Sequence, residues 1–271
     1  MIFRSINNPN SHLTVKDRKK PSLPVKALLE RELINGSVLD FGCGLGMDVR
    51  FLQEKGFSVT GYDPHYKPNF PESKFDTIIC NYVLNVLLPE EQSHVLMAVS
   101  ELIKPGGKAF FSVRRDIKRN GFLYNPKQKV KTYQCNVVLP YKSVFRTKNC
   151  EIYQYQHYTF LNNGNVKVSP FFEGKNEKTL ITESAMVFAI SEKSPIASSP
   201  VLVIPKRKIA NYFNLSQHEQ IACWMVTNRV REVLKRTQNP DGFSIEISVG
   251  KAAGQIIKHA HIKVKPKFTI I

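Results

Sequence analysis

The stretch Val38-Leu39-Asp40-Phe41-Gly42-Cys43-Gly44-Leu45-Gly46 decides the fold of the first half of this chain. Its first four residues continue an apolar run from Ser37, which predicts a short buried strand over residues 37–41. The three glycines that follow permit a tight turn and a close approach of the backbone to a ligand. A helix fits residues 47–55. The stretch therefore predicts a strand, a glycine loop and a helix in succession.

Strands and helices continue to alternate on both sides of this stretch. Ser22 and Pro24 predict the start of a helix over about 22–34. Further strands are expected at Phe57–Tyr62, Phe75–Leu88 and Lys108–Val113, a helix at Glu90–Lys104, and a closing antiparallel pair at Gln134–Leu139 and Cys150–Tyr158. This order predicts an α/β domain with a doubly wound, Rossmann-like sheet over residues 22–160, preceded by an irregular arm at 1–21.

A second pattern begins after a polar linker at residues 161–178. Strands are expected at Thr179–Ile190, Val201–Ile204 and Phe243–Val249, and Ser216 with Glu219 forms the capping box of a helix that reaches about Thr237. This helix is expected to bury Ile221, Met225, Val230, Val233 and Leu234, and the strand after it to turn Ile245, Ile247 and Val249 inward. The pattern predicts an α+β domain over residues 179–271.

The composition indicates what the chain binds better than how it folds. There are 39 Lys and Arg residues against 22 Asp and Glu residues, a formal net charge of +17, which favours nucleotides or nucleic acid as ligands. A basic protein without any polyanionic target has the same composition. No apolar run approaches the roughly 18 residues of a membrane span, and residues 1–10 contain no secretory signal. We therefore expect a soluble, cytoplasmic protein. The five cysteines form no CxxC pair, so no metal site is expected.

Two acids frame the glycine loop. Asp40 lies two residues before Gly42, and Asp63 closes the next strand, 17 residues beyond Gly46. An acid at the second position can accept hydrogen bonds from ribose hydroxyls. The spacing G-x-G-x-G differs from the dinucleotide fingerprint G-x-G-x-x-G, and a carboxylate at Asp40 would repel a pyrophosphate. An acid at this position instead suits a ligand with a positively charged amino group. These residues therefore favour a nucleoside joined to an amino acid, and S-adenosylmethionine is such a compound.

With these features, residues 22–160 resemble class I S-adenosylmethionine-dependent methyltransferases, and Lys104-Pro105-Gly106-Gly107 belongs to the resemblance. The resemblance implies that the cofactor is held by Asp40, Gly42, Gly44, Gly46 and Asp63. Asn81 falls where the loop after the fourth strand of the family faces the cofactor, although an asparagine there also suits a purely structural role.

The helix and strand that usually follow the second acid are missing. Gly61-Tyr62-Asp63-Pro64 is followed after a short gap by Phe75-Asp76 and then by Tyr82-Val83-Leu84-Asn85-Val86. This arrangement is similar to that of methyltransferases associated with DNA phosphorothioation. The chain has no Asn-Pro-Pro-aromatic motif, which argues against methylation of base amines. The methyl acceptor is left open, with Arg114 and Arg115 as candidates for binding an acidic group.

The end of the chain carries a second candidate site. Strand alternation over residues 254–266 places His259, His261, Lys263 and Lys265 on one face, with Ala260, Ile262 and Val264 on the core face. Two imidazoles on one face suit a nucleophile and its helper at a phosphate, and Lys263 adds a fixed positive charge. The loop that ends at Gln255 offers backbone N–H groups to an anion.

Val201–Arg207, Pro240–Phe243, Ala253-Gly254-Gln255 and His259-x-His261 resemble the histidine-triad (HIT) family over about 179–268. The resemblance implies a covalent histidine–nucleotide intermediate, with His261 as nucleophile, His259 as the first histidine, and Gln255 and Lys263 as binding residues for the nucleotide phosphate. The family's third histidine is replaced by Lys263, and two further family histidines are replaced by Pro200 and Lys208. Catalysis, nucleotide binding without turnover and a docking role are all compatible with this pattern.

The leading interpretation is a bifunctional enzyme that joins methyl transfer to nucleotide hydrolysis, nucleotidyl transfer or nucleotide binding. The alternative is a nucleic-acid-modifying methyltransferase, in which the HIT-like domain is a basic, inactive binding module. Its basis is the segment 114–148, which holds ten basic residues and one acid. A third interpretation is an inactive scaffold. The HIT resemblance also implies a homodimer.

Overall fold

The computed structural model describes residues 5–126, 128–157, 179–191 and 200–269. The chain divides into two compact units, residues 1–160 (unit 1) and residues 161–271 (unit 2). The linker expected at 161–178 lies outside the described residues. Among the helices that the structure describes, none is long and apolar enough to cross a membrane.

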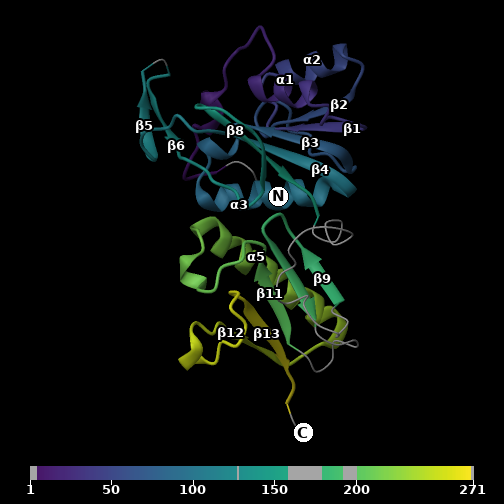
Figure 1. Cartoon of the computed structure of the whole chain (residues 1–271), viewed down its shortest axis with the longest axis vertical. Coiled ribbons are helices and arrows are strands. Elements are labelled where there is room, and N and C mark those ends of the chain that lie inside the picture. Colours follow the sequence, from purple (N-terminus) through teal and green to yellow (C-terminus); the bar gives the residue numbers. More distant parts are fainter. Residues whose placement is uncertain (1–4, 127, 158–178, 192–199, 270–271) are drawn as a thin grey trace. The chain divides into compact units, whose positions relative to one another are not determined.

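Unit 1 is built on a six-stranded sheet in the order β2-β1-β3-β4-β8-β7. The strands are β1 (Ser37–Phe41), β2 (Ser58–Tyr62), β3 (Phe75–Asn81), β4 (Ile103–Arg114), β7 (Lys142–Arg146) and β8 (Cys150–Tyr155). The first four pair in parallel, while β8 and β7 close the edge as an antiparallel pair. The helices α1 (Leu23–Glu30) and α2 (Met47–Glu54) cover one face, and α3 (Pro89–Leu102) lies against the other (Figure 1). The doubly wound sheet predicted from the sequence is confirmed.

The core of unit 1 explains why these segments fold as they do. Ser22 caps α1 by accepting a hydrogen bond from the backbone N–H of Val25 at 3.3 Å, as the sequence predicts. Apolar side chains of α1 and α2 pack on the inner residues of β1, β3, β4 and β8, in a cluster that includes Val25, Leu28, Val38, Leu52, Ile79, Phe110 and Ile152. Burial of this apolar surface fixes the helices on the sheet, and it positions the loops at the carboxyl ends of the parallel strands.

Three predictions for unit 1 are wrong in detail. Residues 104–107 do not separate α3 from the next strand; they form a bulge inside β4, where Gly106 has a φ of +79°. The strand predicted at Gln134–Leu139 is absent. Instead, β5 (Gly121–Asn125) and β6 (Val130–Gln134) pair as a separate two-stranded hairpin, which projects from the unit (Figure 1). The third strand predicted from Phe75 ends at Asn81, and a short 3-10 turn, η2 (Leu84–Val86), follows it.

Unit 2 holds a five-stranded antiparallel sheet in the order β12-β13-β11-β10-β9. Its strands are β9 (Thr179–Glu183), β10 (Val187–Ser191), β11 (Val201–Pro205), β12 (Gly242–Glu246) and β13 (Ile262–Lys267). The helix α5 (Gln217–Gln238) packs on this sheet. Its capping box is confirmed, because the backbone N–H of Ser216 donates to Glu219 at 2.8 Å. The α+β class is therefore also confirmed.

Several local predictions for unit 2 are corrected. The strand predicted over Thr179–Ile190 is a hairpin of β9 and β10. On α5, Val230 and Leu234 are buried as predicted. Ile221, Met225 and Val233 are only half-buried, and the buried side of the helix includes Ala222 and Cys223 instead. On β12, Ile245 is 44% exposed, and Ile247 and Val249 are half-buried beyond its end. The last strand starts at Ile262, so both histidines precede it.

Candidate functional site

The glycine loop of unit 1 adopts a backbone that glycine alone accommodates easily. Gly42, Gly44 and Gly46 have φ values of +85°, +52° and +80°, in the left-handed region. A Cβ on Gly42 would lie 2.3 Å from Val83, and one on Gly44 would lie 2.9 Å from Val15. The backbone of this loop thus lies directly against the segment that follows β3 and against the N-terminal arm.

Asp63, at the end of β2, ties the glycine loop to the rest of the sheet edge. Its Oδ2 accepts a hydrogen bond from the backbone N–H of Gly44 at 3.1 Å. Its Oδ1 accepts from the backbone N–H groups of His65 and Tyr66 at 2.9 and 3.1 Å. Asp63 is 8% exposed, and it lines a cavity together with the loop. The acid thereby orders two loops at once.

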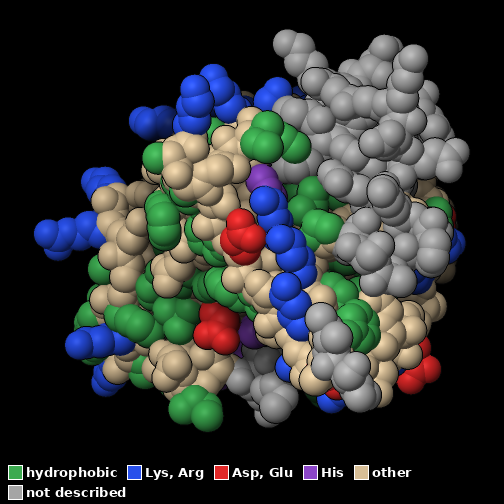
Figure 2. Space-filling view, turned by 90° about the horizontal axis from the view of Figure 1, so that it is seen from below, with side chains coloured by type: hydrophobic (Ala, Val, Ile, Leu, Met, Phe, Trp, Pro, Cys, Tyr) green, Lys and Arg blue, Asp and Glu red, His purple; other side chains and the backbone are tan. Residues whose placement is uncertain are grey.

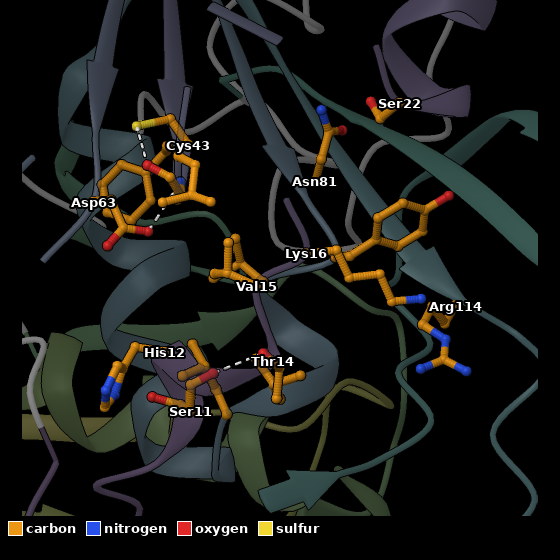
Figure 3. Close-up of a pocket in the computed structure, with 18 of the residues that line it drawn as sticks. Ser11, His12, Thr14, Val15, Lys16, Ser22, Cys43, Asp63, Asn81 and Arg114 are labelled. Atoms are coloured by element: carbon orange, nitrogen blue, oxygen red, sulfur yellow. Dashed lines mark hydrogen bonds between the residues drawn. The ribbon is translucent and has the colours of Figure 1, made fainter. Parts of the chain in front are cut away.

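This cavity has a volume of about 650 Å³, within the usual range for a small-molecule site. The end of β2, the glycine loop and the segment after β3 contribute Asp63, Gly42, Gly44, Asn81 and Tyr82. Asp63 and Cys43 lie at one end, and Lys16 and Arg114 at the other (Figure 3). The site therefore forms at the carboxyl ends of the parallel strands, where doubly wound sheets bind ligands.

Asn81 offers a donor at the cavity wall. Its Oδ1 accepts from the hydroxyl of Ser112 at 2.8 Å, while its buried Nδ2 has no partner among the described residues. A buried amide N–H without a partner is costly, so a ligand acceptor would relieve it. Cys43 of the glycine loop also lines the cavity, and burial raises the pKa of its thiol to about 12. That thiol is protonated at neutral pH and is a poor nucleophile.

Two of the predicted cofactor residues, Asp40 and Gly46, do not line the cavity. Asp40 is buried in β1, and the cavity wall begins with the next residue, Phe41. Burial raises the pKa of Asp40 well above its ordinary value, and the nearby carboxylates of Asp48 and Asp63 reinforce that direction. Gly46 caps α2 and does not line the cavity. Of the six predicted cofactor residues, the four that line the cavity are Gly42, Gly44, Asp63 and Asn81.

The N-terminal arm covers this site, which the sequence did not predict. Ser11, His12, Thr14, Val15, Lys16 and Arg18 all line the cavity. The ring of His12 stacks on that of His65 with centroids 4.1 Å apart, and the Tyr66 hydroxyl donates to the His12 carbonyl at 3.2 Å. Arg18 donates two hydrogen bonds to Asp48 at 3.1 and 3.0 Å. These contacts could not be predicted from the sequence, because the polar composition of the arm does not indicate which distant residues it contacts.

The histidines of unit 2 form a short chain of hydrogen bonds. His259 is fully buried, and its Nε2 lies 2.8 Å from the carbonyl of Pro205, at the end of β11. The Nδ1 of His261 lies 2.9 Å from the carbonyl of His259. Because a carbonyl only accepts, both nitrogens carry their protons. In neutral His261 the lone pair therefore resides on Nε2, the nitrogen that a nucleophilic role requires.

Ion pairs hold the turn after β11 that supports His259. The guanidinium of Arg207 donates to Glu219 at 2.7 and 2.6 Å, and Lys206 pairs with Glu183. Burial lowers the pKa of Lys206 to about 8, although Glu183 opposes that shift. Burial also lowers the pKa of His259, which keeps its ring neutral.

The other candidate residues of unit 2 have partners within the unit. Gln255 donates to the carbonyls of Ala210 and Ile257 at 2.8 and 3.1 Å, and it accepts from the N–H of Gly250 at 2.8 Å. Lys263 lies 3.8 Å from Glu246 on β12. On the face in Figure 2, Lys and Arg side chains form a row with acidic side chains beside it. The predicted common face of the histidines and lysines is not uniform, because both histidines are buried while Lys263 is partly exposed.

Comparisons with known proteins match both units. A family model described as "Methyltransferase domain" matches residues 15–162, and one described as "HIT domain" matches residues 173–270. Bis(5'-adenosyl)-triphosphatase of Dictyostelium discoideum is 32% identical over 98 residues, which cover 36% of this chain and 64% of that protein. AP-4-A phosphorylase of Mycobacterium tuberculosis (strain H37Rv) is 23% identical over 112 residues, which cover 40% of this chain and 57% of that protein.

A solved structure of a hypothetical histidine triad nucleotide-binding protein from Sulfolobus tokodaii is also similar. It has 27% sequence identity and a TM-score of 0.33, and the match covers 35% of this chain and 64% of that one. This chain thus spans less than two thirds of the length of each of these three relatives.

Proposed function

This chain belongs to the methyltransferase domain family, whose model matches more than half of it, and it carries a C-terminal HIT domain. From that premise we propose that unit 1 binds S-adenosylmethionine in its cavity and transfers the methyl group to an acceptor. The observation that carries the proposal is the glycine loop, with three positive φ values, bonded to Asp63 on the wall of that cavity.

The residues present fit this cofactor. Gly42 and Gly44 present backbone without a side chain to the cavity, the Asp63 carboxylate can accept hydrogen bonds from ribose hydroxyls, and Asn81 has an amide N–H to donate. When bound, S-adenosylmethionine supplies an electrophilic methyl group on a sulfonium. The work of the chain is then to orient that methyl group, to exclude water under residues 11–18, and to position the acceptor.

The experiment that tests this proposal is calorimetric titration with S-adenosylmethionine. Asp63→Ala removes both the ribose acceptor and the anchor of the loop, so we expect at least a tenfold loss of affinity. Glu54→Ala, on the far end of α2, is the control and should bind like the wild type. Unchanged affinity of Asp63→Ala would reject the role of Asp63.

For unit 2 we propose cleavage of a nucleotide phosphoanhydride, the chemistry that the name bis(5'-adenosyl)-triphosphatase describes in the relative. Nε2 of His261 attacks the phosphorus that is joined to one nucleoside, and a P–N bond forms. The rest of the polyphosphate, with the other nucleoside, leaves with the electrons of the broken P–O bond. Water then breaks the P–N bond, releases the nucleoside monophosphate and loses a proton to solvent. His259 positions His261 through its carbonyl, and Lys263 contributes positive charge.

Chromatographic assay of bis(5'-adenosyl) triphosphate cleavage tests this second activity. His261→Ala should abolish the release of adenosine monophosphate, whereas His218→Ala, on α5, should retain it. Undiminished release by His261→Ala would remove His261 as the nucleophile. Binding without turnover by the wild type would support the nucleotide-binding interpretation instead, in which Gln255 and Lys263 hold the ligand.

Three finer points stay predictions. The sheet lacks a strand and a helix between Asp63 and Phe75, which supports a relationship to the methyltransferases associated with DNA phosphorothioation. Homodimerisation through unit 2 is tested by light scattering. A cytoplasmic location is tested by fractionation of the source cell.

A further inference from the structure

The β5–β6 hairpin has one face that is turned away from the body of unit 1. Phe122 pairs with Tyr133, and Tyr124 pairs with Lys131, and directly opposed residues of an antiparallel pair share a face. The side chains of Phe122 and Tyr124 are 47% and 60% exposed. The rings of Phe122 and Tyr133 meet edge to face with centroids 5.3 Å apart. This face therefore presents a row of aromatic rings to solvent.

The opposite face of the hairpin borders the cavity. Asn125 and Gln134 line the cavity, Thr132 is fully buried, and the side chain of Asn10 donates to the Lys131 carbonyl at 3.3 Å. The hairpin is thus fixed to the arm that covers the site. A ligand lying along the outer face reaches the rim of the cavity within the length of one strand.

The hairpin and the segment just before it also carry uncompensated positive charge. Lys118, Arg119, Lys129 and Lys131 are exposed, and none of the four forms an ion pair within the part of unit 1 that the structure describes. The one acid of the segment 114–148, Asp116, is bound by Arg114 at 2.9 and 3.0 Å. A partner that binds here is therefore expected to carry several negative charges.

Exposed aromatic rings interleaved with free cations are the features that bind single-stranded nucleic acid. The rings stack on unpaired bases, and the lysines and arginine neutralise the phosphates. A duplex keeps its bases stacked inside, where the aromatic side chains cannot reach them. An anionic lipid surface can bind the cations, but it offers no flat ring on which the aromatic side chains can stack. The combination of both features favours the single strand.

We propose that the outer face of the β5–β6 hairpin, formed by Phe122, Tyr124, Lys131 and Tyr133 with the flanking cations, binds single-stranded nucleic acid beside the rim of the cavity. That the bound strand supplies the methyl acceptor rests on the methyl transfer proposed above. The binding itself does not, so the two can fail separately.

Fluorescence anisotropy with a fluorescein-labelled 12-nucleotide oligothymidylate, without S-adenosylmethionine, tests the proposal on the full chain. Four phosphate contacts predict about a 50-fold loss of affinity between 50 and 200 mM salt. Phe122→Ala with Tyr124→Ala should weaken binding at least 30-fold, since each stacked base contributes roughly 1–3 kcal/mol. Lys129→Glu with Lys131→Glu should weaken it and flatten the salt dependence.

Matched controls separate these effects from general charge and hydrophobicity. Phe213→Ala removes an exposed aromatic ring of unit 2 (73% exposed), and Lys26→Glu with Lys74→Glu reverses two exposed charges elsewhere in unit 1. The aromatic control should bind like the wild type, and the charge control should lose less than threefold. Calorimetry of every variant with S-adenosylmethionine should give wild-type affinity.

Four results would overturn the proposal: no binding of the oligonucleotide at 50 mM salt, equal loss in the control variants, tighter binding of a 12-base-pair duplex than of the single strand, or binding of phosphatidylserine vesicles without binding of the oligonucleotide. Oligonucleotide binding by a chain that does not bind S-adenosylmethionine would instead refute the proposed methyl transfer and leave the hairpin's role intact.

Discussion

In the proposed function, Asp63 serves both the structure and the ligand. Its two oxygens accept three backbone hydrogen bonds, which order the glycine loop and the turn after β2. A carboxylate oxygen has lone pairs for more than one donor, so the same group can still accept from a ligand. Loss of this side chain therefore removes the anchor and the acceptor together, and Asp63→Asn separates the two functions.

We predict that Asp63→Asn retains the fold of the loop but weakens S-adenosylmethionine binding less than Asp63→Ala does. The amide oxygen still accepts a backbone hydrogen bond, whereas the charge-assisted bonds to ligand hydroxyls are lost. Calorimetry ranks the three proteins, and near-ultraviolet circular dichroism checks the fold. Equal affinities of Asp63→Asn and Asp63→Ala would contradict this ranking, whereas wild-type affinity of Asp63→Asn would show that the anchor is the only role of Asp63.

The buried ring of His259 makes the stability of unit 2 depend on pH. Because burial lowers the pKa of His259, the unfolded chain binds the proton more readily than the folded one. The contribution is present above the unfolded pKa of about 6.5 and is lost as pH falls through the lower folded pKa. We predict a loss of at most about 1.4 kcal/mol per pH unit below 6.5 from this group.

Urea titration at pH 5, 6, 7 and 8 measures this effect, with the fluorescence of Trp224 on α5 as a probe local to unit 2. His259→Asn, which keeps a donor for the Pro205 carbonyl, should flatten the decline between pH 7 and 5. His94→Asn, on α3 of unit 1, is the control. A decline as steep in His259→Asn as in the wild type would contradict the assignment.

At the scale of elements, the arm and the glycine loop fit against one another. Gly44 has a positive φ, and a Cβ there would meet Val15 at 2.9 Å. We predict that Gly44→Ala lowers S-adenosylmethionine affinity and destabilises unit 1, and that Val15→Ala in the same chain restores part of both. Gly56→Ala is the matched control, since its φ of +88° carries the same backbone strain with nothing within 4 Å.

A double-mutant cycle on these variants measures the coupling between the two positions. The account predicts a favourable coupling for Gly44→Ala with Val15→Ala, and none for Gly56→Ala with Val15→Ala. Additive effects in both pairs would mean that the arm does not pack on the loop in solution.

The same scale explains which elements could be predicted from the sequence. The strand, glycine loop and helix at 37–54 follow from local signals, as do the Ser22 cap and the capping box of α5. The β5–β6 hairpin and the bulge at 104–107 depend on pairing partners, which no local pattern reveals. The buried face of α5 was predicted correctly at Val230 and Leu234. It was misplaced in the first half of the helix because Ala222 and Cys223 carry a weaker hydrophobic signal than Ile221 and Met225.

The residues of the candidate sites also differ in whether the sequence predicts them. Residues with special backbone or strand-end positions, such as Gly42, Gly44 and Asp63, were predictable because few residue types suit those places. Residues 11–18 could not be predicted, because their role depends on tertiary contacts with α2 and the loop after β2. Strand periodicity assigned His259 and His261 to the last strand. They lie instead in the segment before β13, where both are buried.

For the whole molecule, the candidate residues of the two sites lie in separate compact units. We predict that Asp63→Ala leaves cleavage of bis(5'-adenosyl) triphosphate unchanged, and that His261→Ala leaves S-adenosylmethionine affinity unchanged, each within twofold. Parallel assays of both variants test this independence. Loss of both activities in either variant would mean that the sites act as one.

The central claim is that the loop at Gly42–Gly46 receives S-adenosylmethionine beside Asp63. A crystal structure of the full chain grown with this compound tests the claim most directly. The account predicts density for the nucleoside with its ribose hydroxyls within hydrogen-bond distance of the Asp63 carboxylate. An empty cavity at saturating compound, or a nicotinamide dinucleotide bound there in its place, would contradict the claim.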